Sequence, residues 1–427
     1  MDEWLECTAV EPEISATFGK LYFAHGNIEF TSHRNGASYC SAAYLPAYPL
    51  ALWIAQSWWR LFYELKPNSN TYEWSATHCM RFAGHGFLWP DVWLQTDGVF
   101  MDILARPYVA DEEEPIEYFP HESRGVPLDR METCFSRFMD KVIERLDRTE
   151  PNLEKLWREV LHERQDDALF NVKLRPLWGM IEMNFLSRNS RFDENGQAMG
   201  NSLLEALAAF RQSGETHDND LKKKFSSLSS ARGVQGRFDL PVLPHDTPPR
   251  NTLQPWDLGR NLAHQLRKQA GITGKIDNKM LGDMLGLNEK NFNSLQPETE
   301  APFSFGTKNA DSYTFTFLKE RIESKRFQAA RFIGDYCTSQ LRQQDDKWLI
   351  LSDSSTFRQK AQRAFGAELL MPVDLITEHT GGNYTQANVK KVAAEFEVSP
   401  VLAATQLANH KLISPAEVEL YSYASGW

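Results

Sequence analysis

Cysteine is scarce in this sequence, and the cysteines present are spread along the whole chain. There are 5 in 427 residues, an odd number, and no two of them form a C-x-x-C pair. A disulfide framework needs an even set at short, regular spacings, so the class of small disulfide-bonded secreted domains is excluded. We expect reduced thiols in a cytoplasmic protein, at Cys7, Cys40, Cys79, Cys134 and Cys337.

Long apolar runs are also missing. The most apolar stretch, Tyr48–Tyr63, is interrupted by Gln56 and Arg60, whereas a membrane-spanning helix needs about 20 predominantly apolar residues. The opening residues Met1–Glu3 do not resemble the basic and apolar regions of a secretion signal. The sequence therefore predicts a soluble, cytoplasmic protein with no membrane partner.

Positive charge is in the minority. Lysine and arginine number 46 against 57 aspartates and glutamates, which gives a net charge of −11 and an isoelectric point near 5.6. A broad nucleic-acid surface needs clustered Lys and Arg. Nucleic acid is therefore a partner only if a local basic patch forms, and a protein partner is favoured.

The chain is long enough for more than one domain. A single core stops growing beyond about 250 to 300 residues, and hydrophobic residues make up 42% of this sequence. Residues 1–125 are predicted to form a mixed strand and helix domain. The patterns in it are paired strands in Phe18–Phe30, a helix over Pro49–Tyr63, and a hairpin in Trp89–Pro107 with its turn at Asp97 and Gly98.

Apolar residues at helical spacing follow in residues 126–230. They predict helices over Asp129–Arg148, Asn152–Gln165 and Asn201–Arg211. Residues 231–256 are rich in proline and are interpreted as a linker, which leaves 257–427 as a last domain. The predicted fold class is α+β.

Two segments of the last domain resemble one family. Arg326–Tyr336 reads R-F-Q-A-A-R-F-I-G-D-Y, and Phe365–Pro372 reads F-G-A-E-L-L-M-P. The first is similar in spacing to the R-F-x-x-A-H-E-x-G-H stretch of the ImmA/IrrE family of metallopeptidases, in which H-E-x-x-H supplies two zinc ligands and a general base. The second resembles the family's F-A-A-E-L-L-M-P segment. Tyr313–Leu318 resembles the strand before the active-site helix, and Val389–Ile413 resembles the closing helices.

The resemblance covers roughly residues 255 to 415 and implies a mostly helical, zincin-like peptidase domain with a short sheet. At the positions of the two histidines and the glutamate stand Arg331, Asp335 and Phe332. The family's third ligand is acidic, and this sequence offers no carboxylate in Gln359–Arg363. Zinc takes imidazole, thiolate or carboxylate ligands. We therefore expect no metal, no cofactor and no catalytic residue, and we interpret Glu368 as a surface or capping carboxylate.

Arg331 and Asp335 are four residues apart on the predicted helix, so they share one face. They are interpreted either as an ion pair that fills the vacant metal position or as two separate charges that face solvent. Such a pair on a helix surface stabilises by only about 0.2 to 0.5 kcal/mol.

Active members of the resembling family cleave repressors that control mobile elements or stress responses. The resemblance therefore implies a catalytically degenerate protein of a bacterial regulatory, stress or phage-defence system that binds a protein partner. A second reading is a DNA-binding regulator. Helix-turn-helix patterns in Lys279–Leu295 and Val389–Leu407 motivate it, with polar side chains available for bases at Asn288, Lys290, Asn291 and Asn293, and at Thr405, Gln406 and Asn409.

A third reading is an active zinc endopeptidase with a rearranged site. Its ligands would come from Asp335, Glu320, Glu323 or His379, none of which is at an expected position. In the first domain, His78 and Asp102 have no diagnostic spacing. No zinc-site spacing joins these residues to His25, His33, Cys40, Cys79 or His85 of the same domain.

Overall fold

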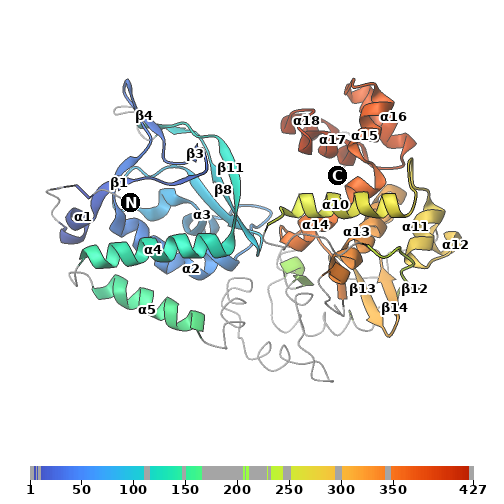
Figure 1. Ribbon diagram of the computed structural model, residues 1–427, viewed down its shortest axis with the longest axis horizontal. Helices are drawn as coiled ribbons and strands as arrows, with labels where there is room; N and C mark the ends of the chain where they lie inside the picture. The colour runs from blue at the N-terminus through green and yellow to red at the C-terminus, as the bar shows by residue number, and fades with distance from the viewer. Residues whose placement is uncertain are drawn as a thin grey trace. The chain divides into compact units, whose positions relative to one another are not determined.

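The chain divides into two compact units, Met1–Ser187 and Arg188–Trp427. Both units mix helices with antiparallel strands, which confirms the α+β class (Figure 1). No helix in the described part of the chain is long and apolar enough to cross a membrane. The computed structural model describes Trp4, Leu5, Cys7, residues 11–109, 116–146, 151–165, 205–206, 208–210, Leu228, 232–243, 252–293, 301–341 and 348–422.

Short antiparallel sheets make up the β part of the first unit. Their strands, in sheet order, are β11 (Glu122–Pro127), β8 (Phe100–Ala105) and β7 (Val92–Thr96); β5 (Ser38–Cys40), β4 (His33–Asn35), β10 (Ile116–Tyr118) and β9 (Tyr108–Val109); β1 (Phe18–Leu21) and β6 (Ala43–Pro46); and β2 (Ala24–His25) and β3 (Ile28–Glu29).

Helix α2 forms the centre of the first core. Its Trp58 is 1% exposed, and its ring centroid lies 4.5 Å from Phe62 and 5.0 Å from Trp157. Burying a large apolar side chain of this kind stabilises by about 1.5 to 3 kcal/mol. The helices of this unit are α1 (Pro12–Ala16), α2 (Ala47–Tyr63), α3 (Tyr72–His78), the 3-10 helix η1 (Met80–Ala83), α4 (Leu128–Leu146) and α5 (Pro151–Gln165).

The predicted helices and the hairpin of the first unit are confirmed, the hairpin with one shift. In Phe18–Phe30, β2 pairs with β3, whereas β1 pairs with β6 outside that segment. The hairpin of β7 and β8 turns one residue later than expected, because Asp97 N–H donates to the carbonyl oxygen of Phe100 and leaves Gly98 and Val99 at the tip. Gly98 has φ +88°, a conformation that glycine adopts without strain. The Asp97 carboxylate accepts from the backbone N–H groups of Val99 and Phe100 and so holds the turn.

One four-stranded antiparallel sheet anchors the second unit. Its order is β12 (Val234–Gly236), β14 (Ser312–Thr316), β13 (Ser304–Asn309) and β15 (Trp348–Leu351). The predicted strand is thus confirmed as β14. The predicted linker 231–256 is not a linker throughout, since β12 is paired in this sheet and Phe238 stacks on Tyr336 at 4.1 Å.

Helices cover the rest of the second unit, and α10 runs across α13 and α14 (Figure 1). A Cβ added at Gly259 of α10 would lie 2.2 Å from the carbonyl oxygen of Ala361 on α14, so only glycine permits this approach. The helices are α10 (Pro255–Gln269), α11 (Asn278–Leu285), α12 (Glu289–Asn293), α13 (Ile322–Leu341), α14 (Phe357–Leu370), α15 (Val373–Thr380), α16 (Gln386–Glu395), α17 (Pro400–Asn409) and α18 (Pro415–Ser422).

The division between the units differs from the predicted domains. Helices α4 and α5 pack on α2 and belong to the first unit, whereas the sequence assigned them to a separate helical region, 126–230. Of the third predicted helix, residues 205–206 and 208–210 are helical, and the rest of Asn201–Arg211 lies outside the described residues.

Candidate functional site

The two segments that resemble the peptidase family pack directly on each other. Helix α13 carries Arg326–Tyr336, and α14 contains most of Phe365–Pro372. A Cβ added at Gly334 would lie 2.6 to 2.9 Å from atoms of the Phe365 side chain. The absence of a side chain at Gly334 therefore lets the Phe365 ring close the interface between the two helices.

Arg331 lies in this interface and is 5% exposed. Its Nη2 donates to the carbonyl oxygen of Ser352 at 2.6 Å and to Oε1 of Gln359 at 2.7 Å. Its Nε has no hydrogen-bond partner among the described residues. Burial first, and then the positive charge of Arg363, lower the pKa of Arg331 to about 9.

Asp335 is bound by a different arginine. Its two carboxylate oxygens accept from Nε and Nη2 of Arg358, each at 2.7 Å. Both interpretations of Arg331 and Asp335 from the sequence are therefore wrong, because both side chains are buried and each finds its partner on or beside α14. A helical spacing of four residues identifies a shared face but not the element that packs against it.

Phe332 fills the space next to these charges. Its side chain is fully buried, and its ring centroid lies 5.2 Å from Phe315 and 5.4 Å from Phe317 on and after β14. A carboxylate at this position would be buried among aromatic rings, where its ionised form is strongly disfavoured.

Gln359 joins the helices to the sheet. Its Oε1 accepts from Ser352 N–H at 2.9 Å, and its Nε2 donates to the carbonyl oxygen of Ile350 at 2.8 Å. The side-chain amide therefore makes one hydrogen bond to β15 and one to the residue that follows it, of the kind that a neighbouring strand would make. Gln362 adds a second donor to Ile350 at 3.2 Å, and Arg358 Nη2 donates to Trp348 at 3.3 Å.

Glu205 completes the network from outside the predicted peptidase domain. Its Oε2 accepts from the Thr356 hydroxyl at 2.7 Å and from Gln359 Nε2 at 3.1 Å. Burial raises the pKa of Glu205, and the charge of Arg358 and the two hydrogen bonds offset part of that effect. The sequence analysis did not single out this residue, because nothing in its local pattern connects it with α13 or α14.

The residues at the three expected metal positions do not fit a zinc ion. Guanidinium has no lone pair to donate, the Asp335 carboxylate is held by Arg358, and the oxygen of Gln359 already accepts two hydrogen bonds. Among the described residues, no group of three or more His, Cys, Asp or Glu side chains is arranged to hold a metal ion.

Glu368 is fully buried, so its interpretation as a surface or capping carboxylate is wrong. Its Oε2 accepts from Gln406 Nε2 at 2.9 Å, and its Oε1 lies 3.2 Å from His264 Nε2. These contacts tie α14 to α17 and α10. The second family-like segment therefore contacts α17, which belongs to the predicted closing helices, and also α10.

A cleft of about 920 Å³ opens over α13 and α14 in the second unit. Phe327, Gln328 and Arg331 line it from α13, and Ser352 and Asp353 line it beyond the end of β15. Its volume is within the usual range for ligand sites, about 300 to 1,000 Å³. The remaining lining residues come from α10, α14, α17 and nearby loops, and they include Trp256, Arg260, Lys360, Arg363, Ala367, Val401, Leu402, Thr405 and Asn409.

The alternative metal ligands are spread over several environments. Asp335 is bound to Arg358, and Glu323 lines the cleft. His379 of α15 lies 3.3 Å from Glu395, and Glu320 is exposed in the loop before α13. The structure thus gives Asp335 and His379 other partners.

Both predicted helix-turn-helix patterns form as helices. In the first, α11 ends at Gly286, which has φ +68°, and α12 follows; in the second, Glu397 with φ +53° connects α16 to α17. Helix α12 is described over Glu289–Asn293, and residues 294–300 lie outside the described part of the chain.

His78, Cys79, His33 and Cys40 of the first unit occupy ordinary structural positions. His78 Nδ1 lies 2.9 Å from the carbonyl oxygen of Trp74, and its ring stacks on the Trp74 ring. Cys79 Sγ donates to Asp91 at 3.2 Å, and His33 of β4 lies opposite Cys40 of β5. Asp102 belongs to β8, whereas His78 is in α3.

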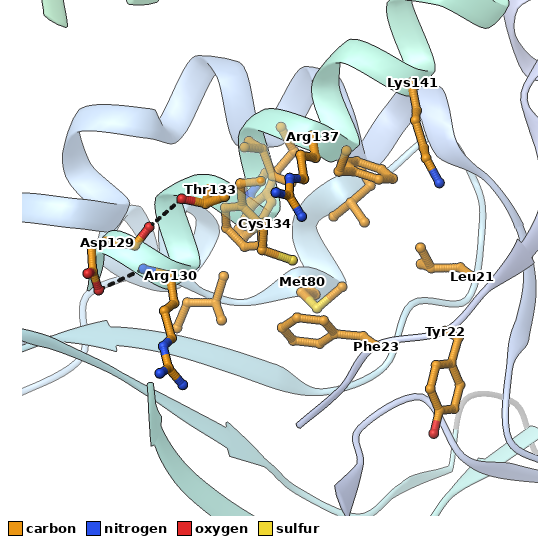
Figure 2. A pocket seen from close by; sticks show the side chains of 16 residues that line it. Leu21, Tyr22, Phe23, Met80, Asp129, Arg130, Thr133, Cys134, Arg137 and Lys141 are labelled. Carbon is orange, nitrogen blue, oxygen red and sulfur yellow. Dashed lines mark hydrogen bonds between the residues drawn. The ribbon is translucent and has the colours of Figure 1, made fainter. Parts of the chain in front are cut away.

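The first unit has a smaller cavity of about 490 Å³ that no sequence motif predicted (Figure 2). Leu21, Phe23 and Met80 contribute apolar walls, and Cys134 and Arg137 face it from α4. Cys134 is an exposed residue, and partial desolvation of its thiol raises the pKa of this group.

Comparisons with protein-family models, with curated proteins and with solved structures find no match to this chain.

Proposed function

We propose that this protein is a catalytically degenerate metallopeptidase-like protein that acts by binding a protein partner in the cleft of its second unit. The observation that carries the proposal is the interface between α13 and α14. There Arg331 donates to Gln359, and Asp335 accepts from Arg358. The Asp335 carboxylate and the Gln359 oxygen are therefore already used by hydrogen bonds that a zinc ion would have to displace.

The packing of the two segments supports a common scaffold. Gly334 and Phe365 meet at the helix interface, and Phe332 takes the place of a general base with an apolar ring. A phenyl group can neither polarise water nor accept a proton. The proposed setting, a bacterial regulatory, stress or phage-defence system, rests on the resemblance alone.

The cleft supports binding as the retained activity. It keeps apolar side chains such as Trp256, Phe327 and Leu402 beside hydroxyl and amide groups, which is the mixture found in sites that hold a ligand in one orientation. DNA binding receives less support, because the net charge of the chain is −11.

Metal analysis of protein purified without chelators tests the loss of the metal site. We expect less than about one tenth of an equivalent of zinc, because no described group of ligands could hold it. Stoichiometric zinc, together with cleavage of a protein substrate that EDTA abolishes, would contradict the proposal.

Partner binding is tested by crosslinking in cells of the source organism, followed by mass spectrometry. Ala367→Trp places a large ring in the cleft, and Ala416→Trp makes the same change at an exposed position of α18. We expect one crosslinked protein to be lost with Ala367→Trp and kept with Ala416→Trp. Equal recovery with both variants would mean that the cleft is not the binding site.

A further inference from the structure

Most of the charged side chains that line the cleft in the second unit are cationic, although the chain as a whole is acidic. The lining also includes two carboxylates, those of Glu323 and Asp353. The net charge of the whole chain is −11. A concave surface of one sign concentrates ligands of the opposite sign. The cationic residues of the lining are Arg260, Lys319, Arg331, Lys360, Arg363 and Lys411.

The charge of Arg331 is not neutralised by a directly bonded carboxylate. Its hydrogen-bond partners are the uncharged oxygens of Ser352, Gln359 and Gln362. Among the described residues no carboxylate lies within ion-pair distance of it. Burying an unpaired guanidinium is costly, and a ligand carboxylate at the cleft wall would supply the missing charge.

Arg363 adds a second guanidinium beside the first. Its Nη1 donates to the carbonyl oxygens of Ser352 and Ser354, at 3.4 and 3.0 Å. Arg331 and Arg363 therefore share the Ser352 carbonyl, which places two positive groups close together. Planar guanidinium groups are well suited to bind carboxylates through two parallel hydrogen bonds.

A buried hydrogen-bond acceptor on α13 indicates that the ligand also carries a hydrogen-bond donor. Gln328, three residues before Arg331 on α13, is 7% exposed, and its Oε1 has no hydrogen-bond partner among the described residues. A peptide with an acidic side chain offers a carboxylate for an arginine and a backbone N–H for such an oxygen. Inorganic phosphate offers mainly acceptors.

We infer that this cleft binds an extended, acidic segment of a partner protein, with Arg331 and Arg363 facing its carboxylates and Gln328 accepting from its backbone. The inference deepens the proposed function and rests on it, because it assigns the charge of the partner to the same cleft. The walls formed by Phe327, Val401 and Leu402 would hold apolar side chains between the acidic ones.

The test uses the purified full-length chain on an array of immobilised twelve-residue peptides. Each Asp- and Glu-containing sequence is paired with a copy that carries Asn and Gln instead. The acidic members should retain at least tenfold more protein than their amide copies, and the ratio should fall when the salt concentration is raised. Arg363→Gln should reduce the ratio about tenfold, whereas Lys391→Gln, an exposed lysine outside the cleft lining, should not change it.

The outcomes separate this inference from the function on which it rests. Equal retention of acidic and amide peptides, sensitive to Ala367→Trp, would overturn the acidic preference and leave partner binding supported. Retention of neither kind would overturn both. A thermal shift produced by inorganic phosphate and not by acetate, without retention of acidic peptides, would make this a phosphate site and overturn the inference.

Discussion

Arg358 holds Asp335 through two hydrogen bonds of 2.7 Å, and both side chains are at most 2% exposed. This pair connects α13 to α14 at the position where the resembling peptidases have a histidine. Attraction between two buried charges offsets their desolvation only when the geometry is good, and here it is bidentate. A substitution at either residue therefore leaves the charge of the other one buried without this partner.

Removing one member of that pair should destabilise the second unit. Asp335→Ala leaves Arg358 buried and unpaired, and Arg358→Ala does the same to Asp335, so we expect a loss of about 3 to 5 kcal/mol from each. Replacing both by apolar residues, Asp335→Leu with Arg358→Met, should recover most of the loss. Hydrogen exchange of α13 and α14 peptides measures the opening free energy locally, and additive effects in the double variant would argue against direct coupling.

Restoring the peptidase motif should fail unless Arg358 is changed as well. Arg331→His, Phe332→Glu and Asp335→His with Gln359→Glu supply a complete ligand set on paper. However, a histidine at position 335 would lie against the Arg358 guanidinium, which now binds Asp335. We expect no stoichiometric zinc in this variant by metal analysis.

Adding Arg358→Leu to those four changes removes the competing charge and should raise zinc content toward one equivalent. The matched control for burial of the new carboxylate carries the same changes, Arg358→Leu included, but keeps Phe332. Tight zinc binding with Arg358 intact would show that the network does not block the site.

The stability of the second unit should depend on pH through Glu205. Burial raises its pKa above the ordinary value of 4.5 for a glutamate, so the folded state holds the proton more tightly than the unfolded state. The stabilisation from this group is complete below pH 4.5 and is lost as pH rises through the folded-state pKa. Glu205→Gln keeps an acceptor for Thr356 and removes the titration, so its melting temperature should vary less with pH above 4.5. Parallel pH profiles for the two proteins would refute this assignment.

Gly259→Ala should cost about 1 to 3 kcal/mol by overpacking. The new Cβ would lie 2.2 Å from a backbone oxygen of α14, which cannot rotate away. Gly274→Ala is the control, because nothing lies within 4 Å of its Cβ position, and it should change stability by no more than about 0.5 kcal/mol. Urea denaturation compares the two, and equal midpoints would mean that the helices move apart easily.

Helices with strong local patterns were predictable from the sequence. Pro49–Tyr63 corresponds to α2, and both predicted helix-turn-helix segments form helices near the expected positions. The periodicity of apolar residues and glycine at a helix end are local signals. Strand β12 was missed because Val234–Gly236 has 3 residues and is defined by its pairing with β14, about 80 residues further on.

The arrangement of the candidate site was less predictable, because its contacts are distant in the sequence. The degenerate positions Arg331 and Asp335 could be identified, but their partners Gln359 and Arg358 lie 28 and 23 residues away. Glu205 is 154 residues from Gln359. Burial of a charged residue depends on which element covers it, and a single sequence does not encode this as a pattern.

The side-chain amide of Gln359 also affects how readily the protein aggregates at high concentration. In the described part of the sheet β15 is an edge strand, and exposed edges can recruit strands from other molecules and start aggregation. The side chains of α14 already occupy the outward carbonyl groups of Trp348 and Ile350. These contacts oppose self-association through this edge.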